Sequence, residues 1–139
     1  MARTLLVEIV TPERILYTNE VEMVVAPTID GEIGVLPLHA PLVSVLRPGE
    51  IRVKWNADKN VEWFAVSGGY IQVHEDKVII LADEAAIVSK IDLERARRAL
   101  ELAKERAASI AEEDTEGVSA CERDLRWCEL QVELAQKHK

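Results

Sequence analysis

The stretch SKIDLERARRALELAKERAASI, residues 89–110, contains neither Gly nor Pro and decides the fold class. From Leu93 onward its apolar residues return at alternating steps of three and four, which predicts a helix with one apolar side. All five Pro and five of the six Gly lie before Tyr70, outside this stretch. Because Gly and Pro supply turns and interrupt helices, this segregation predicts two different architectures in one chain.

A second segment repeats the helical pattern after residue 110. The two apolar seams consist of Leu93, Ala96, Leu100, Ala103, Ala107 and Ile110, and of Val118, Cys121, Leu125, Cys128, Val132 and Ala135. Two short seams joined by a tight connection predict an antiparallel helical hairpin over residues 87–139. Ser89 and Ser119 are expected to start the two helices, and Gly117 to end the first. Half of the first seam is alanine, so the hairpin is expected to close weakly.

The first half of the chain is divided into short apolar runs rich in β-branched residues. These runs are residues 4–10, 15–17, 21–26, 42–46, 51–55, 61–66, 70–73 and 78–81. They recur about every ten residues, and Asp30-Gly31 and Glu75-Asp76 between them are typical of hairpin turns. Residues 1–86 are therefore expected to form an antiparallel β-sandwich or barrel, which makes the chain α+β.

Charge and hydropathy exclude several classes of partner. The net charge is −8, and residues 1–88 carry thirteen acidic against seven basic side chains, which disfavours nucleic acid. No apolar run approaches the ~18 residues of a membrane span, so direct membrane insertion is not expected. The first ten residues do not resemble a signal peptide. We expect a cytosolic chain, or one held at a membrane only through partners.

The sequence offers no recognisable catalytic or metal-binding group. None of its three histidines, His39, His74 and His138, lies at metal-ligand spacing from another His or Cys. Ser67-Gly68-Gly69 lacks the length and the lysine of a phosphate-binding loop and is more typical of a bulge or a close approach between strands. Cys121 and Cys128, about 10.5 Å apart on a helix, are expected to be free thiols. A hydrolase would need a nucleophile and base that we do not find.

Several motifs in fixed order resemble the epsilon subunit of F-type ATP synthases, which is called delta in mitochondria. They are GEIGVLPLHAPL at 31–42, Arg47-Pro48-Gly49, Ser67-Gly68-Gly69, VIILA at 78–82, and Ile91-Asp92-x-x-Arg95-Ala96. The resemblance is strong over the first 96 residues and only architectural beyond them. The family has an N-terminal β-sandwich and a C-terminal helical hairpin, in agreement with the residue patterns.

The resemblance implies a non-catalytic subunit of the rotating central stalk. Such a subunit couples proton movement through the c-ring to ATP synthesis, and its hairpin inhibits ATP hydrolysis. The implied partners are the gamma subunit, the c-ring and, through the hairpin, the alpha/beta catalytic hexamer, at the cytoplasmic face of the bacterial inner membrane. Glu32 matches a contact near the ring, and His39, Pro41 and Leu42 match contacts toward gamma. Each of these residues also suits a purely structural role, as a solvated hairpin residue or a strand end.

Some bacterial members of this family bind ATP in the hairpin. The residues that match such a site are Ile91, Asp92, Arg95, Ala96 and Arg123. The acidic residue that ATP-binding members carry a few positions earlier is replaced here by Ala86. No cofactor is expected, and regulatory ATP stays an open alternative, because Asp92 equally suits a helix cap and Arg95 a surface charge.

A different function is a free-standing adaptor. In that alternative the sandwich binds one partner and the hairpin docks into another helical bundle. Association with a multi-subunit ATPase distinguishes the two hypotheses.

Overall fold

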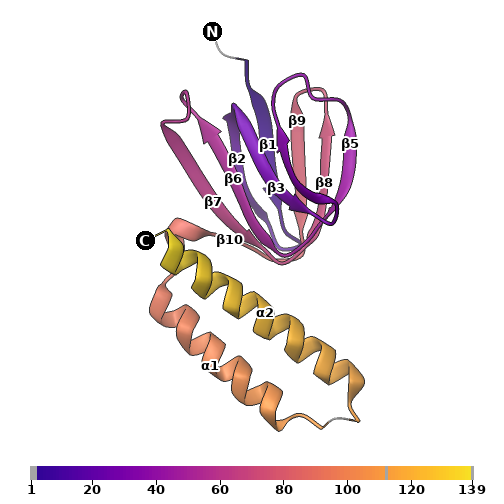
Figure 1. Cartoon of the computed structure of the whole chain (residues 1–139), viewed down its shortest axis with the longest axis vertical. Coiled ribbons are helices and arrows are strands. Elements are labelled where there is room, and N and C mark those ends of the chain that lie inside the picture. The colour runs from indigo at the N-terminus through magenta and orange to yellow at the C-terminus, as the bar shows by residue number, and fades with distance from the viewer. Residues whose placement is uncertain (1–2, 112, 139) are drawn as a thin grey trace. The chain divides into compact units, whose positions relative to one another are not determined.

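The computed structural model describes residues 3–111 and 113–138, and the chain divides into two compact units, Met1–Ile87 and Val88–Lys139 (Figure 1). The strands that the structure describes belong to the first unit and the two α-helices to the second. The predicted fold class, a β-sandwich followed by two helices, is confirmed.

The first unit is a ten-stranded sheet that curls on itself into a near-barrel sandwich (Figure 1). Its strands are β1 (Leu5–Val10), β2 (Ile15–Val21), β3 (Met23–Thr28), β4 (Gly31–Val35), β5 (Leu42–Leu46), β6 (Gly49–Trp55), β7 (Asn60–Val66), β8 (Gly69–His74), β9 (Lys77–Ala82) and β10 (Ala85–Ile87). They pair in the order β10-β7-β6-β3-β5-β8-β9-β1-β2, and β4 pairs with β3. Among the described pairs, β1 with β9 is parallel and the others are antiparallel.

The core of the sandwich follows from strand alternation. In β1, Leu5, Val7 and Ile9 are buried while the residues between them are only half-buried. Successive side chains of a strand point to opposite faces, so β1 contributes every second residue to the interior. Phe64 is the largest of the fully buried side chains and contacts the Tyr17 ring edge to face, with centroids 4.7 Å apart.

Of the two predicted hairpin turns, one is present as predicted and the other is shifted by one residue. Glu75 and Asp76 join β8 to β9 with φ angles of 49° and 58°. Left-handed backbone at both turn residues matches the twist of antiparallel strands. Between β3 and β4 the turn residues are Ile29 and Asp30, and Gly31, with φ 114°, already begins β4. The sequence reading missed β4 and β10, because β4 has glycine at two of its five positions and β10 has three residues.

The second unit contains a short 3-10 helix, η1 (Val88–Lys90), followed by α1 (Leu93–Ser109) and α2 (Thr115–Lys137). Every residue of the two predicted seams is buried or half-buried. An ion pair of 3.7 Å between Arg106 Nη1 and Asp124 Oδ2 joins the last turn of α1 to the first half of α2. The predicted helical hairpin is confirmed, and Leu134, which the seam pattern did not include, is also buried.

The predicted helix ends were wrong in detail. Asp92, not Ser89, begins α1, because its Oδ1 accepts hydrogen bonds from the Glu94 and Arg95 amides at 3.1 and 3.3 Å. Asp114 begins α2 by accepting the Gly117 amide at 2.9 Å, so Gly117 lies in the first turn of α2 and does not end α1.

Gly117 leaves room for two neighbouring side chains in the first turn of α2. A Cβ there would meet Asp114 Oδ2 at 2.5 Å and Ile110 Cδ1 at 2.6 Å. Aspartate is among the best N-cap residues, and here Asp114 caps α2 in place of the predicted capping box that starts at Ser119.

Candidate functional site

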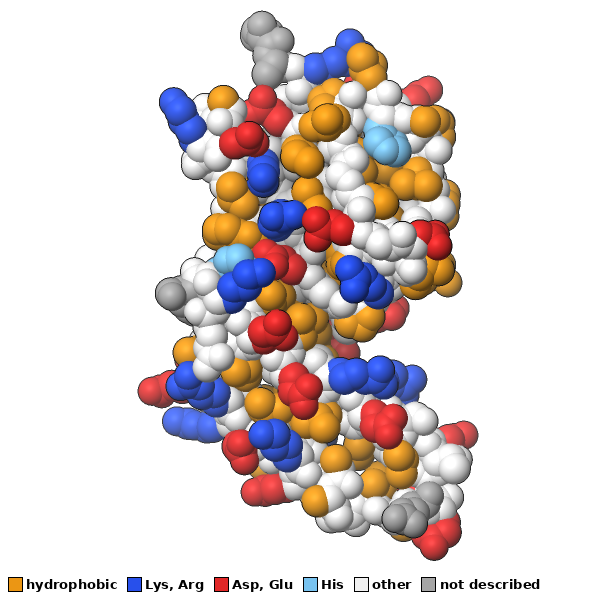
Figure 2. Space-filling view, in the orientation of Figure 1, with side chains coloured by type: hydrophobic (Ala, Val, Ile, Leu, Met, Phe, Trp, Pro, Cys, Tyr) orange, Lys and Arg blue, Asp and Glu red, His pale blue; other side chains and the backbone are white. Residues whose placement is uncertain are grey.

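Exposed apolar side chains form a continuous row across three strands of the sandwich. Val45 of β5 lies opposite Tyr70 of β8, and Tyr70 lies opposite Leu81 of β9. Val43, two residues earlier on β5, points to the same side. The exposed fractions are 70% for Val43, 55% for Tyr70, 47% for Leu81 and 39% for Val45. We call these four residues the apolar face, and Figure 2 shows hydrophobic side chains gathered on the side of the unit where β5, β8 and β9 lie.

The apolar face is suited to binding another protein. Ile71 and Ile80, which alternate with Tyr70 and Leu81 along the same strands, are fully buried in the core. The strands are therefore apolar on both sides, a pattern typical of sheets that are covered on both faces. Contiguous exposed apolar patches commonly mark interaction sites, so the apolar face is a candidate interface.

The loop of residues 36–41 extends the apolar surface at one end. Leu38 is 70% exposed and has left-handed backbone, with φ 69°. Its N–H donates a hydrogen bond of 2.7 Å to Oδ1 of Asp76 in the β8–β9 turn. Val43 pairs with Gln72, close to that turn. The loop therefore lies at the Val43 end of the apolar face.

Three of the predicted interface residues belong to this loop or follow it directly. The His39 ring is half-buried, and its Nδ1–H donates to the Ala40 carbonyl at 2.7 Å. Pro41 is exposed. Leu42 lies on the inward side of β5 and packs against the core. Because neighbouring residues of a strand point in opposite directions, Val43 and not Leu42 is the exposed residue at this end of β5.

Glu32, the fourth predicted interface residue, lies elsewhere. It is exposed on β4, and its Oε1 is 3.1 Å from Nη2 of Arg52 on β6. An exposed ion pair of this kind contributes less than about 1 kcal/mol. The β3–β4 turn beside Glu32 lies at the Leu46 end of β5, whereas the His39 loop enters β5 at Leu42. The structure therefore separates Glu32 from the other three residues.

The structure does not bring together all five residues that match an ATP site. Four of them, Ile91, Asp92, Arg95 and Ala96, lie at the start of α1. Arg123 lies in the first half of α2, and its neighbour Asp124 pairs with Arg106 near the end of α1. Since a helix rises about 1.5 Å per residue, Arg106 is about 16 Å along the axis from Arg95. ATP binding stays a prediction, and in this conformation the site would form without Arg123.

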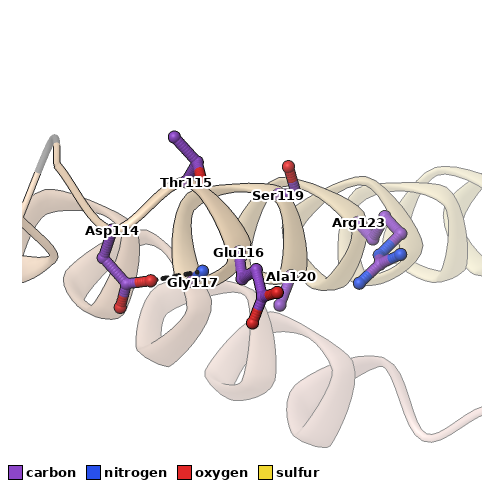
Figure 3. A pocket seen from close by; sticks show the side chains of 7 residues that line it. All are labelled: Asp114, Thr115, Glu116, Gly117, Ser119, Ala120 and Arg123. Carbon is purple, nitrogen blue, oxygen red and sulfur yellow. Dashed lines mark hydrogen bonds between the residues drawn. The ribbon is translucent and has the colours of Figure 1, made fainter.

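An open depression of about 730 Å³ surrounds the start of α2 (Figure 3). It is lined by Asp114, Thr115, Glu116, Gly117, Ser119, Ala120 and Arg123. In Figure 3 the carboxylates of Asp114 and Glu116 lie on one side of the helix, opposite the Ser119 hydroxyl. Two carboxylates against one guanidinium give the depression a net negative charge, which disfavours an anionic ligand.

Over residues 3–111 and 113–138, no three or more His, Cys, Asp and Glu side chains are grouped to hold a metal ion. No helix in that part of the chain is long and apolar enough to cross a membrane. Cys121 and Cys128 are free thiols, as the spacing predicted. The apolar face is therefore the best candidate for a functional site in the described part of the chain.

Residues 4–88 match the family described as ATP synthase, Delta/Epsilon chain, beta-sandwich domain. The chain belongs to the ATP synthase delta/epsilon family. An ATP synthase epsilon chain of Brevibacillus brevis is 49% identical over 100 residues, which cover 72% of this chain and 75% of that one. Another, of Halalkalibacterium halodurans, is 43% identical over 132 residues, which cover 95% and 97%. The resemblance seen in the motifs is confirmed.

A solved structure extends the comparison of this delta/epsilon chain beyond the sandwich. A chain in the mitochondrial ATP synthase of Euglena gracilis, a complex of OSCP, F1 and the c-ring, is similar with a TM-score of 0.73 and 26% identity. The match covers 97% of this chain and 82% of that one, so it includes the helices. This delta/epsilon chain is a component of an ATP synthase complex.

Sequence reasoning about this family member missed the apolar face. It selected Glu32, His39, Pro41 and Leu42 from conspicuous loop motifs. A signal was nevertheless present, because residues 78–82, VIILA, are apolar at consecutive positions. Such a strand has both faces apolar and predicts a covered second face.

Proposed function

We propose that this delta/epsilon chain is a non-catalytic subunit of the central stalk, which couples proton movement through the c-ring to ATP synthesis. In this proposal the sandwich unit attaches the chain to the rotating shaft. The family match and the similar chain in a structure of F1 with its c-ring support this role. The apolar face on β5, β8 and β9 is the observation that supports attachment of the sandwich to the shaft.

The gamma subunit is the proposed occupant of the apolar face. Tyr70 has Val45 on one side and Leu81 on the other, so it lies at the centre of the row. Large aromatic side chains at the centre of an apolar patch commonly dominate binding energy, while surrounding residues exclude water. His39 and Pro41, in the loop at the Val43 end, are proposed as flanking contacts to the same subunit.

Glu32 is proposed to contact the c-ring. It lies at the opposite end of β5 from the His39 loop and carries an exposed carboxylate whose ion pair with Arg52 is weak. Separate ends of the sandwich can therefore meet separate partners. The proposed location is the cytoplasmic face of a bacterial inner membrane, where the chain is held through these contacts.

The hairpin unit is proposed to inhibit ATP hydrolysis by binding the alpha/beta hexamer. Its seam includes buried Ala96 and Ala103, which bring little apolar area to the contact between α1 and α2. An element that is only weakly held closed can exchange its internal contacts for those of a partner.

The attachment step is tested by Val43→Asp. Val43 is largely exposed, so the free chain should fold normally, whereas a carboxylate buried at the shaft should lower affinity by about 100-fold or more. Affinity is measured on an F1 complex that lacks its c-ring and its own epsilon subunit. Ala57→Asp is the matched control, because Ala57 is exposed in the loop between β6 and β7, two strands that pair with none of β5, β8 and β9 in the described sheet. Equal affinities of Val43→Asp and wild type would refute the assignment of the face.

A further inference from the structure

The carboxylate of Asp76 joins three segments that are distant in sequence. Oδ1 accepts the Leu38 amide at 2.7 Å, and Oδ2 lies 3.3 Å from Nε of Arg3. Asp76 itself belongs to the β8–β9 turn, where its φ is 58°. One side chain thus connects the N-terminal residues, the loop of residues 36–41 and the turn at the Val43 end of the apolar face.

Leu38 combines an unfavourable backbone conformation with an exposed apolar side chain. Left-handed backbone is costly for a leucine, and its side chain is 70% exposed to solvent. The loop is closed by a 3.2 Å hydrogen bond from the His39 amide to the Leu36 carbonyl, while the Leu38 amide turns to Asp76. Backbone strain that persists around an exposed apolar side chain is characteristic of binding sites.

The carboxylate is a strong acceptor. The hydrogen bond from the Leu38 amide, and after it the Arg3 guanidinium, hold the pKa of Asp76 below its ordinary value of 3.8, although partial desolvation opposes them. Asp76 is therefore ionised at neutral pH. Hydrogen bonds to an ionised acceptor are shorter and stronger than neutral ones, in keeping with the 2.7 Å distance.

We infer that Asp76 is a positioning residue, which fixes the Leu38 side chain at the Val43 end of the apolar face so that it contacts the same stalk subunit. The inference rests on the proposed function, because it takes the occupant of the apolar face from it. It adds a residue that neither the motifs nor the exposed apolar row identified. Asp76 acts through the Leu38 amide and not through its own contact with the partner.

Three variants of the full chain separate this role from general stability. Asp76→Gly removes the carboxylate but keeps the turn, because glycine adopts φ 58° freely. Asp58→Gly is the matched control, since Asp58 has φ 66° in the loop between β6 and β7 and carries the same charge. Asp76→Asn retains an acceptor oxygen and is the conservative replacement.

The first measurement is hydrogen exchange of the Leu38 amide, followed by NMR on each free chain. Loss of the carboxylate should accelerate this exchange about tenfold in Asp76→Gly, and Asp58→Gly should leave it unchanged. Equal exchange in Asp76→Gly and wild type would show that the carboxylate does not hold the loop, and would overturn the inference.

The second measurement is affinity for F1 lacking its own epsilon subunit. Asp76→Gly and Leu38→Ala should each weaken binding about tenfold, and Asp76→Asn less than about threefold. If Asp76 acts through Leu38, the double variant Asp76→Gly/Leu38→Ala should bind as Leu38→Ala does, because the two losses share one cause. A structural role would instead give additive losses with a lowered melting temperature.

The outcomes distinguish the two proposals. Normal affinity of Asp76→Gly, or additive losses in the double variant, overturns the positioning role while the proposed function stands. A wild-type chain that does not bind the F1 complex overturns the proposed function, and the positioning role falls with it.

Discussion

At the scale of single residues, Gly69 shows how a close approach between strands fixes the sandwich. It begins β8 with φ 131°, and a Cβ at this position would overlap the Leu81 carbonyl oxygen and lie 2.9 Å from Ala82 Cα. The neighbouring Gly68 has φ 132°. The sequence reading of Ser67-Gly68-Gly69 as a close approach of backbones, and not a phosphate loop, fits this geometry.

Gly69→Ala should destabilise the chain by about 3 kcal/mol or more, because the new methyl group meets the backbone of β9 in addition to the unfavourable φ. Gly31→Ala is the control, since Gly31 has φ 114° but no atom within 4 Å of the added Cβ. It should cost only about 1–2 kcal/mol. Urea unfolding monitored by tryptophan fluorescence gives both free energies. Equal losses for the two variants would mean that backbone conformation alone, and not the clash, sets the cost.

The sequence patterns predicted local features such as turns. They did not predict which residue of a strand is exposed, because exposure depends on the register of strand pairing. Glu75-Asp76 could be assigned to a turn because its neighbours on both sides are strand-like. The choice between Leu42 and Val43 as the exposed residue could not be made in the same way, since both are apolar. That choice follows from the pairing of Leu42 with Val73 and of Val43 with Gln72 across β5 and β8.

At the scale of elements, the hairpin and the sandwich differ in the size of the buried side chains that stabilise them. The sandwich core contains large branched side chains and Phe64, fully buried. The most buried residues of α1 are Ala96 and Ala103. Periodicity predicted both kinds of element, but not β4 or β10, whose pairing with β3 and β7 depends on tertiary contacts.

The hairpin is expected to open more easily than the sandwich. Native-state hydrogen exchange should give opening free energies for the amides of α1 and α2 at least about 2 kcal/mol below those of Phe64 and Ile71. The reason is the small apolar area of the alanine seam. Equal protection of helices and core strands would contradict the weak closure on which the proposed inhibition depends.

At the scale of the whole molecule, the chain consists of two units with different cores, and their boundary lies between Ile87 and Val88. The segregation of Gly and Pro predicted two architectures from composition alone. The sequence could not predict the candidate site to the same degree, because an interaction surface is built from residues of several strands. Val43, Tyr70 and Leu81 become neighbours only through sheet pairing.

Truncation after Ile87 tests whether the sandwich binds the stalk and the hairpin inhibits hydrolysis independently of each other. β10 stays intact, because Ile87 pairs with Phe64 of β7, so the sandwich should fold and bind the stalk normally. ATP hydrolysis by the reconstituted complex should rise, since the proposed inhibitor is gone. Truncation after Glu84 is the control, because it also removes β10 and should lower the melting temperature of the sandwich. Unchanged hydrolysis after the first truncation would show that the hairpin does not inhibit.

The parallel pairing of β1 with β9 has a consequence for biosynthesis. β1 opens the sandwich and β9 is nearly its last strand, so Val7 finds its partner Val78 only after almost the entire unit has left the ribosome. Contacts between such distant segments carry a loop-closure cost and slow folding. A nascent chain that stalls before β9 therefore exposes one unpaired edge of β1, and chaperones that shield strand edges are most needed during that interval.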